Sequence, residues 1–187
     1  GVPVQGIFRF YPGEWFGLLP NLAHWRRALP RLQMMNPPLR LASQSKRCFS
    51  LWRSGVEVQE SDRQLALQYC PDTEVFNPAR LLHYRRQRDQ LVLKQAFGRM
   101  GDAVLIGALA SPERWDEALT YGTRAPRDVA MQERFLVEPL TFESGFMYPT
   151  VGVYAVNGRF AGYYSRVAAQ PFITHEAYHV ATVIDTA

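Results

Sequence analysis

The stretch Leu91–Gly107 is the feature that most constrains how this chain can fold. It contains two short apolar segments separated by a turn that carries glycine. The spacing predicts a strand at 91–95, a turn at 96–102 and a second strand at 103–107. Lys94 lies within the first apolar segment, and burying an unpaired ammonium group costs several kcal/mol. A phosphate group is the counter-charge that we expect for it.

A helix and a third strand are predicted after this pair. Ser111 is a helix-capping residue and Pro112 suits the first helical position, so we expect a helix over 112–120. The residues at 129–137 predict a strand with Gln132-Glu133 near its middle. The backbone there can read an adenine edge, while a strand with one solvent-facing side explains the same pattern. Together these elements predict a compact α+β lobe.

The turn between the first two strands carries a second cation. Lys94 and Arg99 stand on either side of Gly98, and Gly101 follows. Glycines let the backbone approach a ligand closely while both cations point toward it. The Gly-x-x-x-x-Gly-Lys-Ser/Thr pattern is absent from the sequence. We therefore expect phosphate binding of another kind.

Another lysine is predicted at the start of a helix. Gln44–Trp52 has helical spacing and Ser43 is a candidate cap, which places Lys46 in the first turn. The free N–H groups of a helix start and a lysine together suit an anion, and a solvated lysine on an amphipathic helix is the other interpretation. Elsewhere we expect a strand at 7–10, a helix at 22–28, extended chain at 39–42, a loop or helix at 57–67, a turn-rich link at 71–78, a basic segment at 79–88, and a hairpin of strands 151–156 and 159–166 around Asn157-Gly158.

Composition narrows the class of protein. The 187 residues are 47% hydrophobic and 20% charged, which is typical of an ordered globular chain. We expect no membrane partner, since no apolar run reaches the ~20 residues of a membrane span. The net charge is +4, but Arg85-Arg86-Gln-Arg88 is the only basic cluster, so we expect a small polyanion and no nucleic acid. Cys48 and Cys70 are expected to be free thiols in the cytoplasm.

One motif favours a different chemistry. His175-Glu176-Ala-Tyr-His179 fits the His-Glu-x-x-His pattern, which on a helix binds zinc. Its flanks are rich in β-branched residues and favour a strand or irregular chain. In a strand, residues four apart are about 13 Å from each other, too far to share one zinc ion. We therefore expect no metal at this motif.

Several short segments occur in an order that carries further information. They are Phe10-Tyr-Pro-Gly-Glu-Trp15, Asn36-Pro-Pro38, Ser43-Gln-Ser-Lys46 with Leu51-Trp52, Leu93-Lys94 with Arg99, Gln132-Glu133, and Gly162-Tyr-Tyr-Ser-Arg166 leading to Ile173-Thr174. In this order they resemble the C-terminal part of the glutathionylspermidine synthetase-like family, over nearly the whole chain.

The resemblance implies a circularly permuted ATP-grasp fold of the α+β class. Residues 89–140 would form a small lid lobe, and residues 1–88 and 141–187 would form part of the body. The implied activity is ATP-dependent ligation of a small peptide or amino-acid carboxylate to an amine, through an acylphosphate. In that family the Asp, Glu and Asn that hold Mg²⁺ lie upstream of the matched segment. We therefore expect this chain to be a piece of a longer protein and to be inactive by itself.

The resemblance also implies roles for individual residues. Lys46 and Lys94 would contact the ATP phosphates, and Gln132-Glu133 would line the adenine pocket. Arg99 and Arg166 would stabilise the transferring phosphoryl group, whose spread negative charge is best met by fixed cations. A surface arginine stacked on a neighbouring tyrosine is the other interpretation of Arg166.

Two departures from the family pattern concern the substrate side of the site. Gln95 follows Lys94 where the family commonly has proline, and Arg99-Met-Gly101 replaces an arginine-glutamate-glycine run. From these differences we expect the substrate side of the site to differ from that of the family. The second hypothesis is a non-catalytic relative that binds a nucleotide or peptide, and the presence or absence of the upstream Mg²⁺-binding acids distinguishes it from the ligase.

Overall fold

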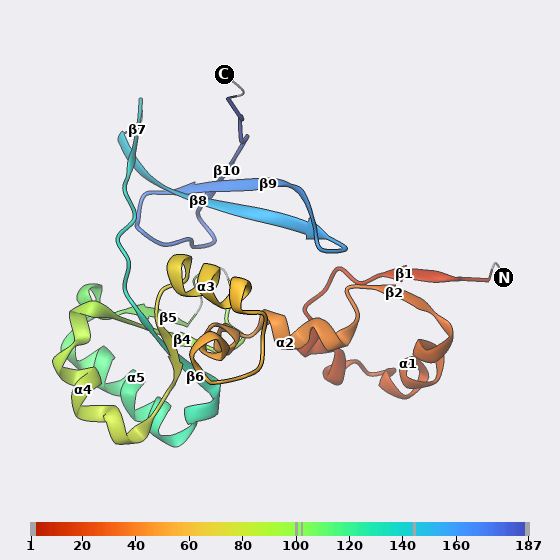
Figure 1. Ribbon diagram of the computed structural model, residues 1–187, viewed down its shortest axis with the longest axis horizontal. Helices are drawn as coiled ribbons and strands as arrows, with labels where there is room; N and C mark the ends of the chain where they lie inside the picture. Colours follow the sequence, from red (N-terminus) through yellow and green to blue (C-terminus); the bar gives the residue numbers. More distant parts are fainter. Residues whose placement is uncertain (1–2, 100, 102, 144, 186–187) are drawn as a thin grey trace. The chain divides into compact units, whose positions relative to one another are not determined.

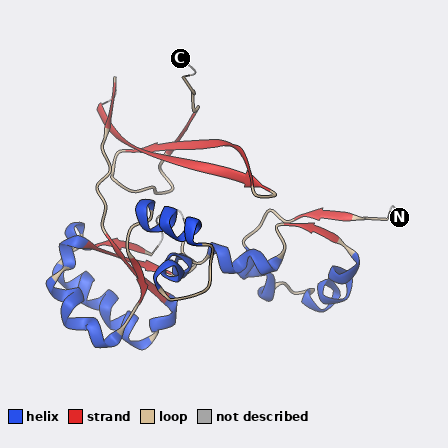
Figure 2. Ribbon diagram, viewed as in Figure 1, coloured by secondary structure: helices blue, strands red, loops and turns tan. Residues whose placement is uncertain are grey.

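The computed structural model describes residues 3–99, 101, 103–143 and 145–185. The chain divides into two compact units, Gly1–Cys70 and Pro71–Ala187 (Figure 1). Both units combine helix and strand (Figure 2). Among the described residues, no helix combines the length and apolar character needed to cross a membrane.

The first unit contains a parallel pair of short strands. β1 (Gly6–Phe8) pairs with β2 (Gln33–Met35), and the connection between them holds the helix α1 (Leu22–Ala28). The predicted helix at 22–28 is confirmed. β2 was not predicted, because three residues are too few to show a period. The other elements of this unit are the 3₁₀ helices η1 (Gly13–Leu18), η2 (Leu29–Arg31), η3 (Pro38–Arg40) and η4 (Lys46–Arg53), and the α-helices α2 (Leu41–Gln44) and α3 (Glu60–Tyr69).

Two predictions in this unit are wrong. The segment 39–42 is helical and not extended, because Pro38 occupies the first position of a helical turn, where its missing N–H is tolerated. Ser43 does not cap the next helix, since its Oγ donates a hydrogen bond to the carbonyl of Arg40 at 2.8 Å. Ser45 is the cap of η4, with its Oγ accepting from the backbone N–H of Arg47 at 3.3 Å. Lys46 is the first residue of η4, as predicted.

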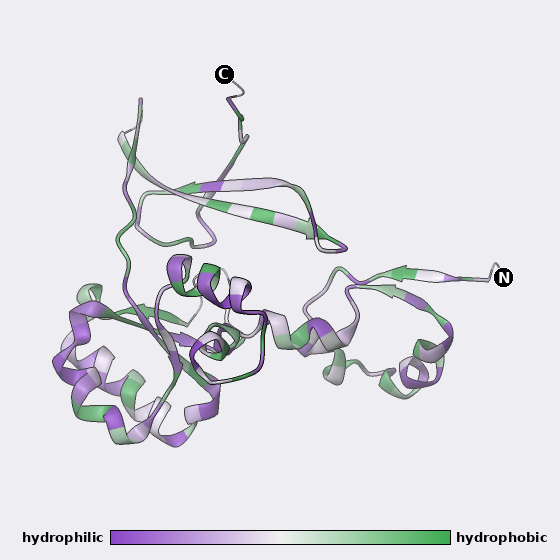
Figure 3. Ribbon diagram, in the orientation of Figure 1, coloured by the Kyte–Doolittle hydropathy of each residue, from purple (hydrophilic) through white to green (hydrophobic). Residues whose placement is uncertain are grey.

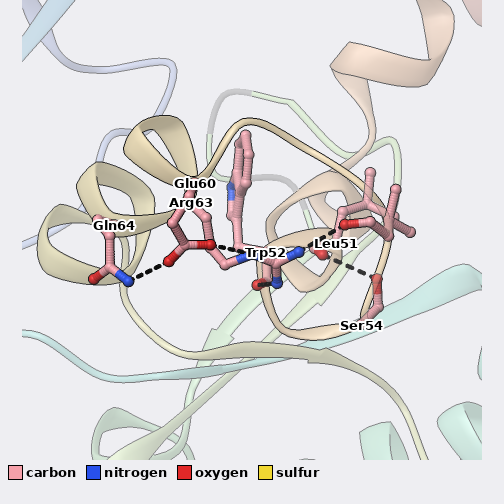
Figure 4. Close-up of polar contacts among 7 residues, drawn as sticks. Leu51, Trp52, Ser54, Glu60, Arg63 and Gln64 are labelled. Carbon is pink, nitrogen blue, oxygen red and sulfur yellow. Dashed lines mark hydrogen bonds and ion pairs between the residues drawn. The ribbon is translucent and has the colours of Figure 1, made fainter.

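Arg63 fixes the connection between η4 and α3 (Figure 4). Its guanidinium donates to the carbonyls of Trp52 and Val56, each at 2.7 Å, and lies 3.6 Å from a carboxylate oxygen of Glu60. Ser54 adds a hydrogen bond to the carbonyl of Leu51 at 2.9 Å. One side chain from α3 therefore satisfies a carbonyl in the last turn of η4 and a carbonyl in the connection that follows it.

The second unit contains an antiparallel four-stranded sheet in the order β3-β6-β4-β5. The predicted strand 91–95 is confirmed as β4, and the predicted strand 103–107 is β5 at Val104–Ile106. The predicted helix at 112–120 is α5, which runs to Arg124 and is capped by Ser111. The elements of this part are β3 (Thr73–Val75), η5 (Pro78–Arg80), α4 (Leu81–Arg86), η6 (Arg88–Gln90), β4 (Leu91–Gln95), β5 (Val104–Ile106), η7 (Gly107–Leu109), α5 (Pro112–Arg124), η8 (Pro126–Asp128) and β6 (Val129–Glu133).

One face of this sheet forms the main core. α4 and α5 pack against it, as Figure 2 shows. The core is a cluster of buried side chains from the sheet, both helices and the segment after β3. Its members are Phe76, Tyr84, Leu93, Trp115, Leu119, Val129 and Met131. The indole Nε1 of Trp115 donates to the carbonyl of Tyr84 at 3.1 Å, which joins α5 to α4.

A second sheet, in the order β10-β9-β8-β7, follows in the chain. The predicted hairpin is confirmed: β8 (Gly145–Val156) and β9 (Arg159–Ala168) pair around Asn157 and Gly158. Both turn residues have positive φ, at 51° and 74°, as the two-residue turn requires. β7 (Leu140–Phe142) and β10 (Tyr178–Val180) complete the sheet. Hydrophobic residues recur along β8 (Figure 3).

The boundary between the units lies at 70/71. Residues 71–88 were expected in the body, but β3 pairs with β6 in the same sheet as β4. The division of the fold into body and lid stays a prediction. Met100 and Asp102 of the predicted turn at 96–102 lie outside the described residues.

Candidate functional site

The face of the β3-β6-β4-β5 sheet that α4 and α5 leave uncovered carries polar side chains. Val92 pairs with Gln132 and with Ile106, while Lys94 pairs with Val104. Residues two apart on a strand share a face. Lys94 and Gln132 therefore lie on the same face of neighbouring strands, with apolar residues between and beside them.

A chain of hydrogen bonds crosses this face. The Lys94 ammonium donates to Oε1 of Gln132. Nε2 of Gln132 donates to Oγ1 of Thr73 at 2.8 Å, and Thr73 donates to the carbonyl of Pro71 at 2.9 Å. Gln132 is 5% exposed and Thr73 is 4% exposed. The structure therefore holds the lysine through two buried polar side chains, and the predicted site residues Lys94 and Gln132 are in contact.

A cavity of about 670 Å³ opens on this face. Val92, Val104 and Ile106 give it an apolar floor beside Lys94 and Gln132, and the segment 134–138 forms a wall. Further lining comes from Pro149–Val151 in β8 and from Pro171–Ile173 after β9. Apolar walls with a few convergent polar groups are typical of sites for small organic ligands.

The segment 134–138, which forms this wall, follows the end of β6, although the sequence predicts it inside a strand. β6 was predicted over 129–137 but ends at Glu133. The backbone N–H of Glu133 donates to the carbonyl of Asp72 at 2.7 Å, and that of Arg134 donates to the carbonyl of Gln90 at 2.8 Å. Beyond them the chain runs to β7 without helix or strand. Gln132-Glu133 therefore stands at the end of the strand and not in its middle.

Gly101 brings the connection between β4 and β5 against the segment after β9. A Cβ at this glycine would lie 2.3 Å from the carbonyl oxygen of Ile173, and its φ is +79°. A glycine is needed at this position because a side chain would clash with Ile173 and because the positive φ strains any residue that has a Cβ. Gly101 and Ile173 both line the cavity.

The other predicted site residues do not line this cavity. Glu133 is exposed at the end of β6, and Arg99 is exposed in the connection after β4. Arg166 lies on β9 with its guanidinium 5.7 Å from the ring centroid of Tyr164. Lys46 belongs to the first unit. The roles of these four residues stay predictions.

The His-Glu-x-x-His motif does not lie on a helix. His179 is in β10, and His175 stands in a turn before it. His179 contacts the hydroxyl of Tyr164 through its imidazole. Within the described parts of the chain, no three His, Cys, Asp or Glu side chains gather where they could hold a metal ion.

The basic cluster at the end of α4 includes two arginines with acidic partners. Arg85 pairs with Asp116 at 2.9 Å, and Arg88 pairs with Asp89 at 2.8 Å.

Cys48 and Cys70 are free thiols.

Three parts of this site are not predicted from the sequence. The segment 71–78 was interpreted as a turn-rich link, although it contains β3 and with it Thr73. The lining residues Arg134 to Glu138 and Pro171 to Ile173 lie in irregular chain. Irregular segments show no hydrophobic periodicity in the sequence. The strand at Thr73–Val75 has only three residues, and Pro71-Asp72 directly before it is typical of a turn.

The architecture is an α+β, partial ATP-grasp fold. D-alanyl-alanine synthetase A from Vibrio cholerae has a similar structure, with a TM-score of 0.50 and 11% sequence identity. The similarity covers 98% of this chain and 55% of that protein, so the chain spans about half the length of this structural neighbour. Among solved structures, 18 chains match. No protein-family model and no curated protein matches the sequence.

Proposed function

We propose that this chain forms the nucleotide-binding part of an ATP-dependent carboxylate–amine ligase. The observation that carries the proposal is Lys94, held by the buried Gln132 on the face of the sheet that opens into the cavity. The likeness of the fold to a D-alanyl-alanine synthetase supports the same general class. Within that class we propose a glutathionylspermidine synthetase-like protein, on the order of motifs in the sequence.

The cavity suits a nucleoside phosphate on chemical grounds. Its apolar floor of Val92, Val104 and Ile106 can pack against a planar base. The irregular chain at 135–138 offers backbone N–H and C=O groups outside a strand ladder, which can bind polar atoms at the edge of a base. Lys94 supplies a positive charge for a phosphate, and such charge-assisted hydrogen bonds are about twice as strong as neutral ones.

Magnesium does not fit the residues of this cavity alone. Mg²⁺ prefers carboxylate and other oxygen ligands in octahedral geometry. Glu138 is the single carboxylate among the described residues that line the cavity. The role proposed for this chain is therefore confined to holding the nucleotide, and the proposal assigns the metal ligands to another part of the parent protein.

In the proposed reaction, a carboxylate substrate accepts the terminal phosphoryl group of ATP, and an amine then displaces phosphate from the acylphosphate. Lys94 would hold an oxygen of the phosphate chain while charge moves during the transfer. The apolar walls would exclude water, which strengthens this interaction.

Calorimetric titration of the 187-residue chain with ADP tests the binding role. Lys94→Ala should weaken binding by about 1–3 kcal/mol, the value of one charge-assisted hydrogen bond. Arg124→Ala is the matched control, because Arg124 is exposed at the end of α5 and does not line the cavity. Equal affinities of Lys94→Ala and the unchanged chain would contradict the proposal.

A further inference from the structure

Thr73 is a buried polar residue that none of the predicted roles includes. It lies at the start of β3, directly opposite Gln132 in β6, and is 4% exposed. Its hydroxyl takes part in two hydrogen bonds, one with Gln132 and one with the carbonyl of Pro71.

The partners of Thr73 fix the direction of its hydrogen bonds. A backbone carbonyl can only accept, so the hydroxyl must give its one proton to Pro71. Its lone pairs are then what it offers to Gln132. A side-chain amide facing an acceptor must present its NH₂ group, and Nε2 of Gln132 lies 2.8 Å from the hydroxyl.

The orientation of the Gln132 amide also determines which of its atoms faces Lys94. Once the NH₂ group of Gln132 faces Thr73, its carbonyl oxygen Oε1 faces the other way, toward Lys94. An ammonium group can only donate, so it binds Oε1 and would be repelled by an amide turned the wrong way round. The carbonyl of Pro71 thus sets, through Thr73 and Gln132, where the charge of Lys94 is held.

We propose that Thr73 is a positioning residue for Lys94, acting by fixing the orientation of the Gln132 amide. The inference rests on the proposed function, because it assigns Thr73 a part in nucleotide affinity. Thr73 does not line the cavity, so its effect must pass through Gln132. A hydrogen-bonded chain of this kind is buried, and buried polar chains hold their members in one arrangement.

The test compares ADP affinity of three variants of the full chain by calorimetry. Thr73→Val keeps the branched shape but removes the hydroxyl, and Thr73→Ala removes it without the second methyl group. Both should bind ADP about 3- to 10-fold more weakly, as expected for the loss of one hydrogen bond in the chain. Thr73→Ser retains the hydroxyl and should bind within about twofold of the unchanged chain. If Thr73→Val fails to fold, Thr73→Ala decides the comparison.

A double-mutant cycle separates positioning from general damage to the fold. In a Lys94→Ala background, Thr73→Val should change ADP affinity by less than about twofold, because the group that Thr73 positions is gone. A loss of the same size in both backgrounds would overturn the inference, and so would wild-type affinity in Thr73→Val and Thr73→Ala.

Failure of the proposed function gives a different result. If the unchanged chain does not bind ADP, or binds it equally well as Lys94→Ala, the nucleotide site itself is wrong and the role of Thr73 falls with it. If Lys94→Ala binds weakly while both Thr73 variants bind normally, the nucleotide site stands and only the positioning role is overturned.

Discussion

The hydroxyl of Tyr84 donates a hydrogen bond of 2.9 Å to Glu74, which joins α4 to β3 beneath the sheet that carries Lys94. The residue is fully buried, and its hydroxyl also accepts from the backbone N–H of Asn77 at 3.1 Å. Burial is the main cause that raises the pKa of Tyr84 to about 12, and the bond to Glu74 adds to it. A carboxylate acceptor favours the protonated phenol.

This raised pKa predicts a loss of stability at alkaline pH. In the unfolded chain the phenol loses its proton near pH 10, while the folded chain keeps it up to about pH 12. Between these values the folded state binds more protons, so the free energy of unfolding falls as pH rises. Urea unfolding at intervals from pH 9 to 12 measures this slope. The Tyr84→Phe variant should be less stable at neutral pH, but its free energy of unfolding should fall less between pH 9 and 12. Equal slopes of the free energy of unfolding against pH in the two proteins would contradict the assignment.

Arg166 lies over the ring of Tyr164, and we predict that its role is in the transition state. In the proposed ligase, Arg166→Ala should lower turnover roughly 100-fold or more with a smaller change in apparent ATP affinity, because differential stabilisation acts on the rate. Arg159→Ala is the control, since Arg159 is exposed on the same strand. Phosphate-release kinetics that show weak ATP binding with near-normal turnover would reject the role.

The His-Glu-x-x-His motif is predicted to hold no zinc. His179 lies in a strand and His175 in the turn before it, whereas a zinc site needs at least three protein ligands at about 2.0–2.3 Å. Elemental analysis of protein purified without chelators or affinity-tag metals measures this directly. About one zinc per chain that disappears in His179→Ala would overturn the prediction.

Gly122 is predicted to tolerate no side chain. It lies in α5, where a Cβ would come within 2.6 Å of the Phe76 ring in the core. Gly122→Ala should therefore destabilise the second unit by about 1–3 kcal/mol, the usual cost of overpacking, despite the better helix propensity of alanine. Gly17→Ala, in η1 of the first unit, serves as the comparison for a glycine with free space around it, because a Cβ there would meet nothing within 4 Å. Denaturant unfolding of both variants decides between packing and propensity.

Arg63 is predicted to stabilise the first unit through backbone carbonyls. Arg63→Ala removes its bonds to the carbonyls of Trp52 and Val56. Hydrogen bonds to charged groups contribute a net stability of about 1.5–3 kcal/mol each, and the bond to Val56 is exposed to solvent, which lowers its share. We expect a loss of about 1–2 kcal/mol in denaturant unfolding. Arg27→Ala should change little, since Arg27 is exposed in α1 and its bond to the carbonyl of Ala23 is 3.4 Å long.

The parts of the fold that the sequence predicts are those with a clear local signal. The helix at 22–28 is followed by Pro30, strand β4 is an apolar run, α5 has the Ser111 cap, and the hairpin has the Asn157-Gly158 turn pair. β3 lacks such a signal, because its three residues form a strand only by pairing with β6. Lys94 and Gln132 were both predicted as site residues, but their contact depends on the register between β4 and β6, which pairing over five residues sets.

The end of β6 shows the limit most clearly. The apolar run continues past Glu133 in the sequence, so propensity alone extends the strand. Glu133 and Arg134 still bond in register to Asp72 and Gln90, the residues just before β3 and β4 begin, so β6 ends where its two partner strands start. The length of a partner strand leaves no trace in the local sequence of β6, and the chain beyond that point forms the irregular wall of the cavity.

The walls of the cavity come from strands of two separate sheets, with β4, β5 and β6 on one side and β8 on the other. A molecule that fills the cavity contacts both sheets at once and links segments that are far apart in the sequence. By mass action, part of its binding free energy then resists separation of the hairpin from the sheet beneath it. Occupancy of the cavity and slow amide hydrogen exchange in β8 and β9 should therefore rise together.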